Sequence, residues 1–88
     1  MPLEFPNRSR SFDEARQTVR FQGYDGMFEV RFLVEAAALL KSAAGRPVVE
    51  ADCLHAFDTA RTTIQDAALK LYKRNRRSMY TLTATDLK

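Results

Sequence analysis

The segment from Val49 to Arg74 carries the pattern that most constrains the fold. Its apolar residues recur at alternating steps of four and three, which places them on one side of an α-helix: Cys53, Phe57, Ala60, Ile64, Ala67 and Leu71. Leu54 and Ala68 widen this apolar face. The pattern therefore predicts one long helix over residues 49–74, with an apolar face that other elements must cover.

A β-hairpin is the second element that the sequence predicts. Two segments that alternate apolar and polar residues, 17–24 and 27–34, flank the pair Asp25-Gly26, which favours a two-residue type I′ turn. That turn places Phe21 opposite Val30. It also places one set of residues on a single face of the hairpin, as a half-buried antiparallel pair requires: Val19, Phe21, Phe28, Val30 and Phe32.

The remaining elements are shorter. We expect an edge strand over 3–5, between two prolines, then a polar loop over 7–11 and a turn over 12–15. An alanine-rich helix over 35–44, ended by Gly45, should follow. Asn75 in the left-handed conformation should end the long helix, and the last strand is expected over 79–83. Residues 1–88 then form one domain of the α+β class with the order β-β-β-α-α-β. Its small antiparallel sheet has three to four strands, and two helices pack on one face.

The cysteine content and the hydropathy of the chain favour a cytoplasmic protein. Cys53 is the only cysteine among 88 residues, so an internal disulfide cannot form, which suits a reducing compartment. No apolar run approaches the roughly 20 residues that span a bilayer. The first six residues lack the features of a signal peptide. We therefore expect no membrane partner.

The chain offers no recognisable catalytic or metal-binding arrangement. Asp52, Cys53, His55 and Asp58 are close in sequence, but Cys53 and His55 are two residues apart and would face different sides of a helix. One histidine with carboxylates makes a poor zinc site. With only three glycines, the chain also lacks a glycine-rich phosphate loop. We expect a protein that is not an enzyme and that has no metal and no cofactor.

Arg61 is the candidate for a structural ion pair. It lies beside the apolar face of the long helix, between Phe57 and Ile64. Its stem could pack along the helix while its guanidinium reaches solvent. Alternatively, the guanidinium could bind a carboxylate at the sheet edge, with Asp13 or Glu35 as the partner. The sequence leaves both arrangements open.

Two groups of basic residues are candidates for anion contacts. Residues 1–66 carry eight Lys or Arg against ten Asp or Glu, whereas residues 67–88 carry six against one. The basic residues of the second segment interleave with aromatic ones, as in nucleic-acid surfaces, although the helix dipole also favours bases at this end: Lys70, Lys73, Arg74, Arg76 and Arg77, with Tyr72 and Tyr80. In the predicted hairpin, Arg20 would also face Arg31 on the outer side of the sheet, with Arg16 nearby. Either acids relieve that repulsion or the three arginines bind an anion.

Several short motifs together resemble one family of small bacterial proteins. They are Phe5-Pro6, Val19-Arg20-Phe21, Gly26, Glu35-Ala36, Ala56-Phe57 followed by Arg61, Ile64 and Ala67-Ala68, and the closing segment 82–87. The chain resembles the family catalogued as domain of unknown function 1488. It departs from that pattern at Val34, where members typically carry Ser, and in a longer, alanine-rich segment between the helices. The resemblance implies a compact α+β domain in the bacterial cytoplasm and supplies no catalytic residues.

Two functions from different classes are consistent with these features. The first is a non-enzymatic binding or interaction domain, with an unknown protein partner or with a second copy joined through a sheet edge or an uncovered apolar surface. The second is an accessory nucleic-acid-binding protein that uses the basic end of the long helix. We favour the first, because no nucleic-acid-binding motif accompanies a short basic cluster on an otherwise slightly acidic chain.

Overall fold

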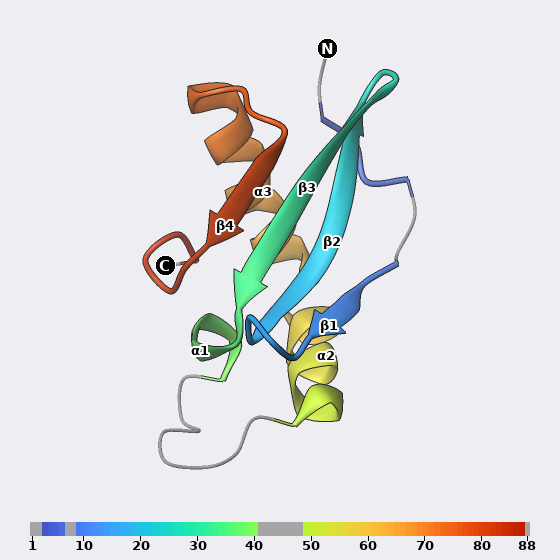
Figure 1. Cartoon of the computed structure of the whole chain (residues 1–88). Coiled ribbons are helices and arrows are strands. Elements are labelled where there is room, and N and C mark those ends of the chain that lie inside the picture. Colours follow the sequence, from blue (N-terminus) through green and yellow to red (C-terminus); the bar gives the residue numbers. More distant parts are fainter. Residues whose placement is uncertain (1–2, 7–8, 41–48, 88) are drawn as a thin grey trace.

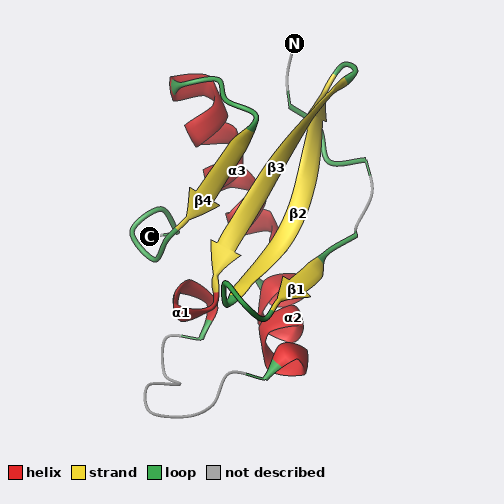
Figure 2. Cartoon of the chain, viewed as in Figure 1, coloured by secondary structure: helices red, strands yellow, loops and turns green. Residues whose placement is uncertain are grey.

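A mixed four-stranded sheet carries its long helices on one face (Figure 1). The computed structural model describes residues 3–6, 9–40 and 49–87. The strands and helices, coloured by type in Figure 2, are β1 (Ser11–Asp13), β2 (Thr18–Asp25), β3 (Phe28–Glu35), α1 (Ala36–Leu39), α2 (Glu50–Thr59), α3 (Arg61–Arg74) and β4 (Met79–Leu82). The predicted α+β class is confirmed, as is its order of strands, then helices, then a strand.

The last strand pair runs parallel, so the expectation of an entirely antiparallel sheet is wrong. The strand order is β1-β2-β3-β4, and β4 lies parallel to β3 with Phe32 opposite Tyr80. Between these strands, α2 and α3 carry the chain back along the sheet to the end where β3 begins. A strand that follows such a helical crossover runs in the same direction as the strand before it.

The N-terminal segment pairs with β2 at two separate places. Glu4 forms a single bridge with Tyr24, with backbone hydrogen bonds of 2.8 and 2.7 Å, where a short strand was expected. Pairing resumes at β1. The loop expected over 7–11 and the turn expected over 12–15 are therefore wrong for Ser11–Asp13, which form a strand. The turn follows this strand, where Gln17 N donates to Glu14 O. Residues 7 and 8 lie outside the described residues.

The hairpin exists, but its register differs from the predicted one by two residues. Asp25 lies opposite Phe28, so the turn consists of Gly26 and Met27. Gly26 has a φ of 62° and Met27 has no positive φ, which is the pattern of a type II′ turn with glycine at the first central position. Because a shift of two residues keeps every side chain on its face, the predicted core face survives.

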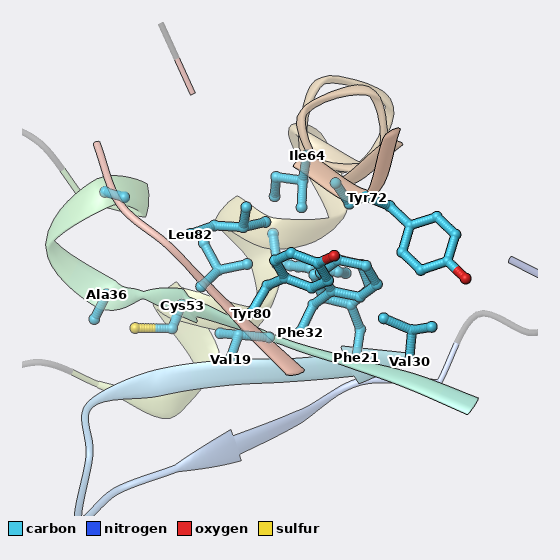
Figure 3. Close-up of a cluster of buried hydrophobic side chains, with 14 of the residues drawn as sticks. Val19, Phe21, Val30, Phe32, Ala36, Cys53, Ile64, Tyr72, Tyr80 and Leu82 are labelled. Carbon is cyan, nitrogen blue, oxygen red and sulfur yellow. The ribbon is translucent and has the colours of Figure 1, made fainter. Parts of the chain in front are cut away.

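Aromatic contacts explain the observed register. Phe21 lies directly opposite Phe32, which lies opposite Tyr80, so that three neighbouring strands carry a row of stacked rings (Figure 3). The ring centroids are 5.1 Å apart for the first pair and 5.3 Å for the second. Such pairs add to the stability that burial alone provides. The predicted register would have put Val30 opposite Phe21 and broken this row.

A buried hydrogen bond holds the end of the hairpin against α3. The Tyr72 hydroxyl donates to Asp25 Oδ2 over 2.5 Å, and Asp25 is only 8% exposed. The bond to this carboxylate, together with burial, raises the pKa of Tyr72. Asp25 is therefore the last residue of β2 and has a hydrogen-bond partner on α3. The turn consists of the two residues that follow it, Gly26 and Met27.

The predicted long helix is interrupted at Ala60. This residue separates α2 from α3 and has a φ of −100° and a ψ of 14°. The Thr59 hydroxyl donates to the His55 carbonyl over 3.0 Å, a contact that often bends helices. The predicted apolar face is nevertheless the buried one, and Tyr72 also belongs to it. The predicted residues of this face are all buried or half-buried: Cys53, Leu54, Phe57, Ala60, Ile64, Ala67, Ala68 and Leu71.

Two predicted helix ends differ from the structure. The helix expected over 35–44 contains α1, which ends at Leu39, while residues 41–44 and Gly45 lie outside the described residues. Asn75 has a φ of −157° and a ψ of 104°, so it is extended, and the expected left-handed conformation is wrong. The chain therefore leaves α3 directly towards β4.

Asp58 joins the N-terminal segment to the bend between α2 and α3. Arg10 donates to both oxygens of Asp58 over 3.0 and 2.8 Å, and Arg61 donates to one of them over 2.8 Å. Arg61 also lies over the Phe57 ring. The hydrogen bonds from Arg10, and then those from Arg61, lower the pKa of Asp58.

This geometry corrects the ion pair that the sequence suggested. The Arg61 guanidinium binds Asp58, three residues earlier on the same chain segment, and the predicted partners were Asp13 and Glu35. Asp13 instead accepts a hydrogen bond from the Arg16 backbone over 3.2 Å and lies 4.0 Å from the Arg16 guanidinium. The two helices thus hold Arg61 in place.

Replacing Gly23 with alanine tests how closely the N-terminal segment covers β2. A Cβ at Gly23 would lie 2.9 Å from the Phe5 ring and 3.1 Å from the Glu4 carbonyl oxygen. We expect G23A to lower the free energy of unfolding by roughly 1–3 kcal/mol, measured by urea denaturation. An unchanged midpoint for G23A would contradict this packing.

Replacing Asp58 with asparagine tests the ion pairs as a function of pH. A lowered pKa means that Asp58 stabilises the fold above its ordinary pKa of about 3.9, and that this contribution disappears as the pH falls through the folded-state pKa. We expect D58N to lower the melting temperature near neutral pH by at most about 4 °C, because Asp58 is exposed. In strong acid the two proteins should melt together. An equal difference at both pH values would refute this assignment.

Candidate functional site

The basic residues predicted from the sequence gather at the end of α3 and in the segment that follows. All five are exposed, and among the described residues none forms an ion pair with an acid: Lys70, Lys73, Arg74, Arg76 and Arg77. Their positive charges therefore face solvent without an acidic side chain to neutralise them, and those in the last turn of α3 interact favourably with the negative end of the helix dipole. The structure brings these predicted residues together at one end of the molecule.

The two tyrosines predicted to lie among them belong to the core. Tyr72 and Tyr80 are each 8% exposed, and their rings meet edge to face at 6.4 Å. The Tyr80 hydroxyl accepts a hydrogen bond from Arg77 N over 2.8 Å and donates to the Asn75 carbonyl. Both rings are therefore buried, which argues against the stacking on nucleic-acid bases that the sequence suggested.

The tip of the hairpin exposes two large apolar side chains that the sequence had not singled out as a site. Met27 is 99% exposed and Phe28 is 77% exposed. Phe28 lies on the core-facing side of β3, as predicted. Because β4 begins opposite Arg31, the start of β3 has no described strand along that edge, and Phe28 lies beyond the start of β4. The only signal in the sequence was the Met-Phe pair directly after the turn glycine.

The hairpin tip and the basic end of α3 form one surface. Both lie at the same end of the molecule (Figure 1), and they share a shallow hollow. The residues that line it are Phe28, Glu29, Val30, Tyr72, Arg76, Arg77 and Ser78. The Arg76 guanidinium lies 5.6 Å from the centre of the Tyr72 ring. We call Met27, Phe28, Arg76 and Arg77 the tip surface.

The residues considered for a metal or a nucleophile do not assemble into a site. Within the described ranges, no three His, Cys, Asp or Glu side chains could hold a metal ion. Cys53 is fully buried, and burial raises the pKa of its thiol, which disfavours the nucleophilic thiolate. His55 and Asp52 are exposed on α2, and Asp58 binds two arginines. Among the described helices, none is long and apolar enough to cross a membrane.

Comparisons with known proteins identify the family but no activity. The family described as protein of unknown function (DUF1488) matches residues 3–83. A crystal structure of a DUF1488-family protein of unknown function from Shewanella loihica PV-4 is 16% identical, with a TM-score of 0.75 over 91% of this chain and 90% of that one. That likeness confirms the fold. No curated protein matches the chain. The chain therefore belongs to the DUF1488 family.

Proposed function

We propose that this protein is a non-enzymatic binding domain of the bacterial cytoplasm, and that its tip surface contacts a protein partner. The observation that carries the proposal is the exposure of Met27 and Phe28, at 99% and 77%, beside Arg76 and Arg77. Exposed apolar side chains that adjoin one another and are rimmed by charge are typical of interaction sites.

The chemistry of the tip surface indicates what kind of protein segment it fits. Burying a Met or Phe side chain contributes about 1.5–3 kcal/mol, so the two side chains can supply the apolar part of an interface. Methionine adapts its shape to a partner. The arginines have no acidic partner among the described residues, so a segment that combines apolar and acidic side chains would complement this surface.

A second copy of the chain fits the tip surface less well. Two copies that met through this surface would bring Arg76 and Arg77 of each close to those of the other, and like charges at an interface oppose association. Self-association is better served by the open edge of β4, which has no strand beside it among the described residues. We therefore assign the tip surface to a different protein.

Nucleic-acid binding is the alternative function. The exposed basic residues of α3 and the segment after it could contact phosphates, and Phe28 could take the stacking role once assigned to the tyrosines. One exposed ring makes a small stacking platform, however, and the remaining predicted aromatics are buried. This alternative predicts binding that weakens steeply as the salt concentration rises. Binding through apolar contacts of Met27 and Phe28 should not weaken in this way.

Selection of peptides from a random displayed library on the full chain tests the proposal. We expect enriched peptides to combine acidic with apolar residues. Phe28→Ser should weaken their binding at least tenfold, because a central aromatic contributes much of an interface's affinity. Arg76→Gln with Arg77→Gln should weaken it as well. Val49→Ser is the matched control, since Val49 is 49% exposed at the start of α2, and it should bind like the unaltered chain.

Random single-stranded DNA and RNA, titrated from 50 mM salt upwards, separate the two functions. Micromolar affinity for these strands that is lost steeply with salt would favour phosphate contacts and contradict the protein partner. Peptide binding that is equally strong in Phe28→Ser would also reject the tip surface as the contact.

A further inference from the structure

The outer face of the sheet carries a second hollow, on the side away from α2 and α3. It is lined in part by Arg16, Arg20, Arg31, Leu33 and Met79. No described helix covers this face (Figure 1). Glu29 lines both this hollow and the one beside the tip surface, but none of the four residues that define the tip surface lines this one.

Two apolar side chains lie among the polar ones that make up most of this hollow. Leu33 projects from β3 on the outer side, opposite Arg20, and is only 6% exposed. Met79 on β4 lines the same hollow and is 44% exposed. Long arginine side chains cover apolar surface with their stems while their guanidinium groups stay in water. Met79 and the arginine stems thus form the accessible apolar part of the lining, with charged groups around it.

The rim carries one positive charge that no described acid neutralises. Arg31 Nε donates to Glu29 over 3.0 Å, and the Arg16 guanidinium lies 4.0 Å from Asp13. Arg20 has no acidic partner among the described residues. Asp13 and Glu29 are thus engaged, and Glu35, which lies diagonally across from Arg20 on β3, forms no ion pair among the described residues. The Arg20 guanidinium therefore keeps its donors for a ligand.

The observed register lets two arginines serve one ligand. Arg20 lies opposite Leu33, and Arg31 lies opposite Gln22, so the two arginines are diagonal neighbours and do not face each other as predicted from the sequence. Diagonal positions on neighbouring strands are about 7–8 Å apart, within reach of both long side chains. Guanidinium groups bind planar carboxylates and phosphates through paired hydrogen bonds.

We propose that this hollow binds a small anion built on a flat apolar ring. The ring would lie on Met79 and the arginine stems beside it, and one carboxylate or phosphate group would accept hydrogen bonds from Arg20 and Arg31. The two anionic groups share this chemistry, and the experiment separates them.

Amide NMR titration of the full chain tests the proposal with four probes: phenyl phosphate, benzoate, benzamide and inorganic phosphate. We expect saturable shifts at Arg20, Gln22 and Leu33 with at least one of the two ring-bearing anions, and the tighter of these identifies the preferred anionic group. Benzamide and inorganic phosphate should bind at least fivefold more weakly, because each lacks one of the two features. Non-saturating shifts with both ring-bearing anions would overturn the site.

Two variants locate the binding. Arg20→Gln should weaken the better anion at least tenfold, whereas Arg77→Gln, a change on the tip surface, should leave its affinity unchanged. Equal affinity in Arg20→Gln, or equal loss in both variants, would overturn the assignment. If inorganic phosphate bound as tightly as phenyl phosphate, the apolar part of the lining would have no role and the proposed ligand class would be wrong. None of these results bears on peptide binding at the tip surface.

Discussion

The hydrogen bond between Tyr72 and Asp25 connects the two halves of the chain. It joins the end of β2 to the last turns of α3, 47 residues apart in sequence, in a place where Asp25 is 8% exposed. A buried carboxylate needs such a partner, because leaving it unpaired would cost free energy. Since Asp25 is held in the strand, Gly26 and Met27 form the turn, and Phe28 emerges beside Arg76. The tip surface therefore follows from this contact.

Much of the fold could be predicted from patterns that extend over many residues. The apolar face of residues 53–71 and the alternation around Phe21 and Phe32 each specify a face, and a register shift of two residues left those faces unchanged. The details that failed depend on contacts between distant residues. Nothing near Asp25 in sequence indicates Tyr72, and nothing near Asp58 indicates Arg10. The parallel β4 likewise depends on the return path through α2 and α3.

The candidate site was predictable in its charge and not in its apolar part. A run of basic residues at a helix end remains exposed in almost any packing, so Arg76 and Arg77 lie where the sequence placed them. Aromatic residues could be either core or surface. Tyr72 and Tyr80 can be buried because their hydroxyls donate hydrogen bonds to Asp25 and to the Asn75 carbonyl. Phe28, by contrast, lies beyond the start of β4 and stays exposed. Burial depends on neighbours that the local sequence does not show.

A double-mutant cycle on Asp25 and Tyr72 tests the central claim most directly. Urea unfolding would be followed for Asp25→Ala, Tyr72→Phe and the double variant. If the two side chains stabilise the fold through one shared bond, each single change lowers the unfolding midpoint and the double variant falls little further than the less stable single one. If the two losses simply add, the residues act independently, and the hydrogen bond does not set the end of the hairpin.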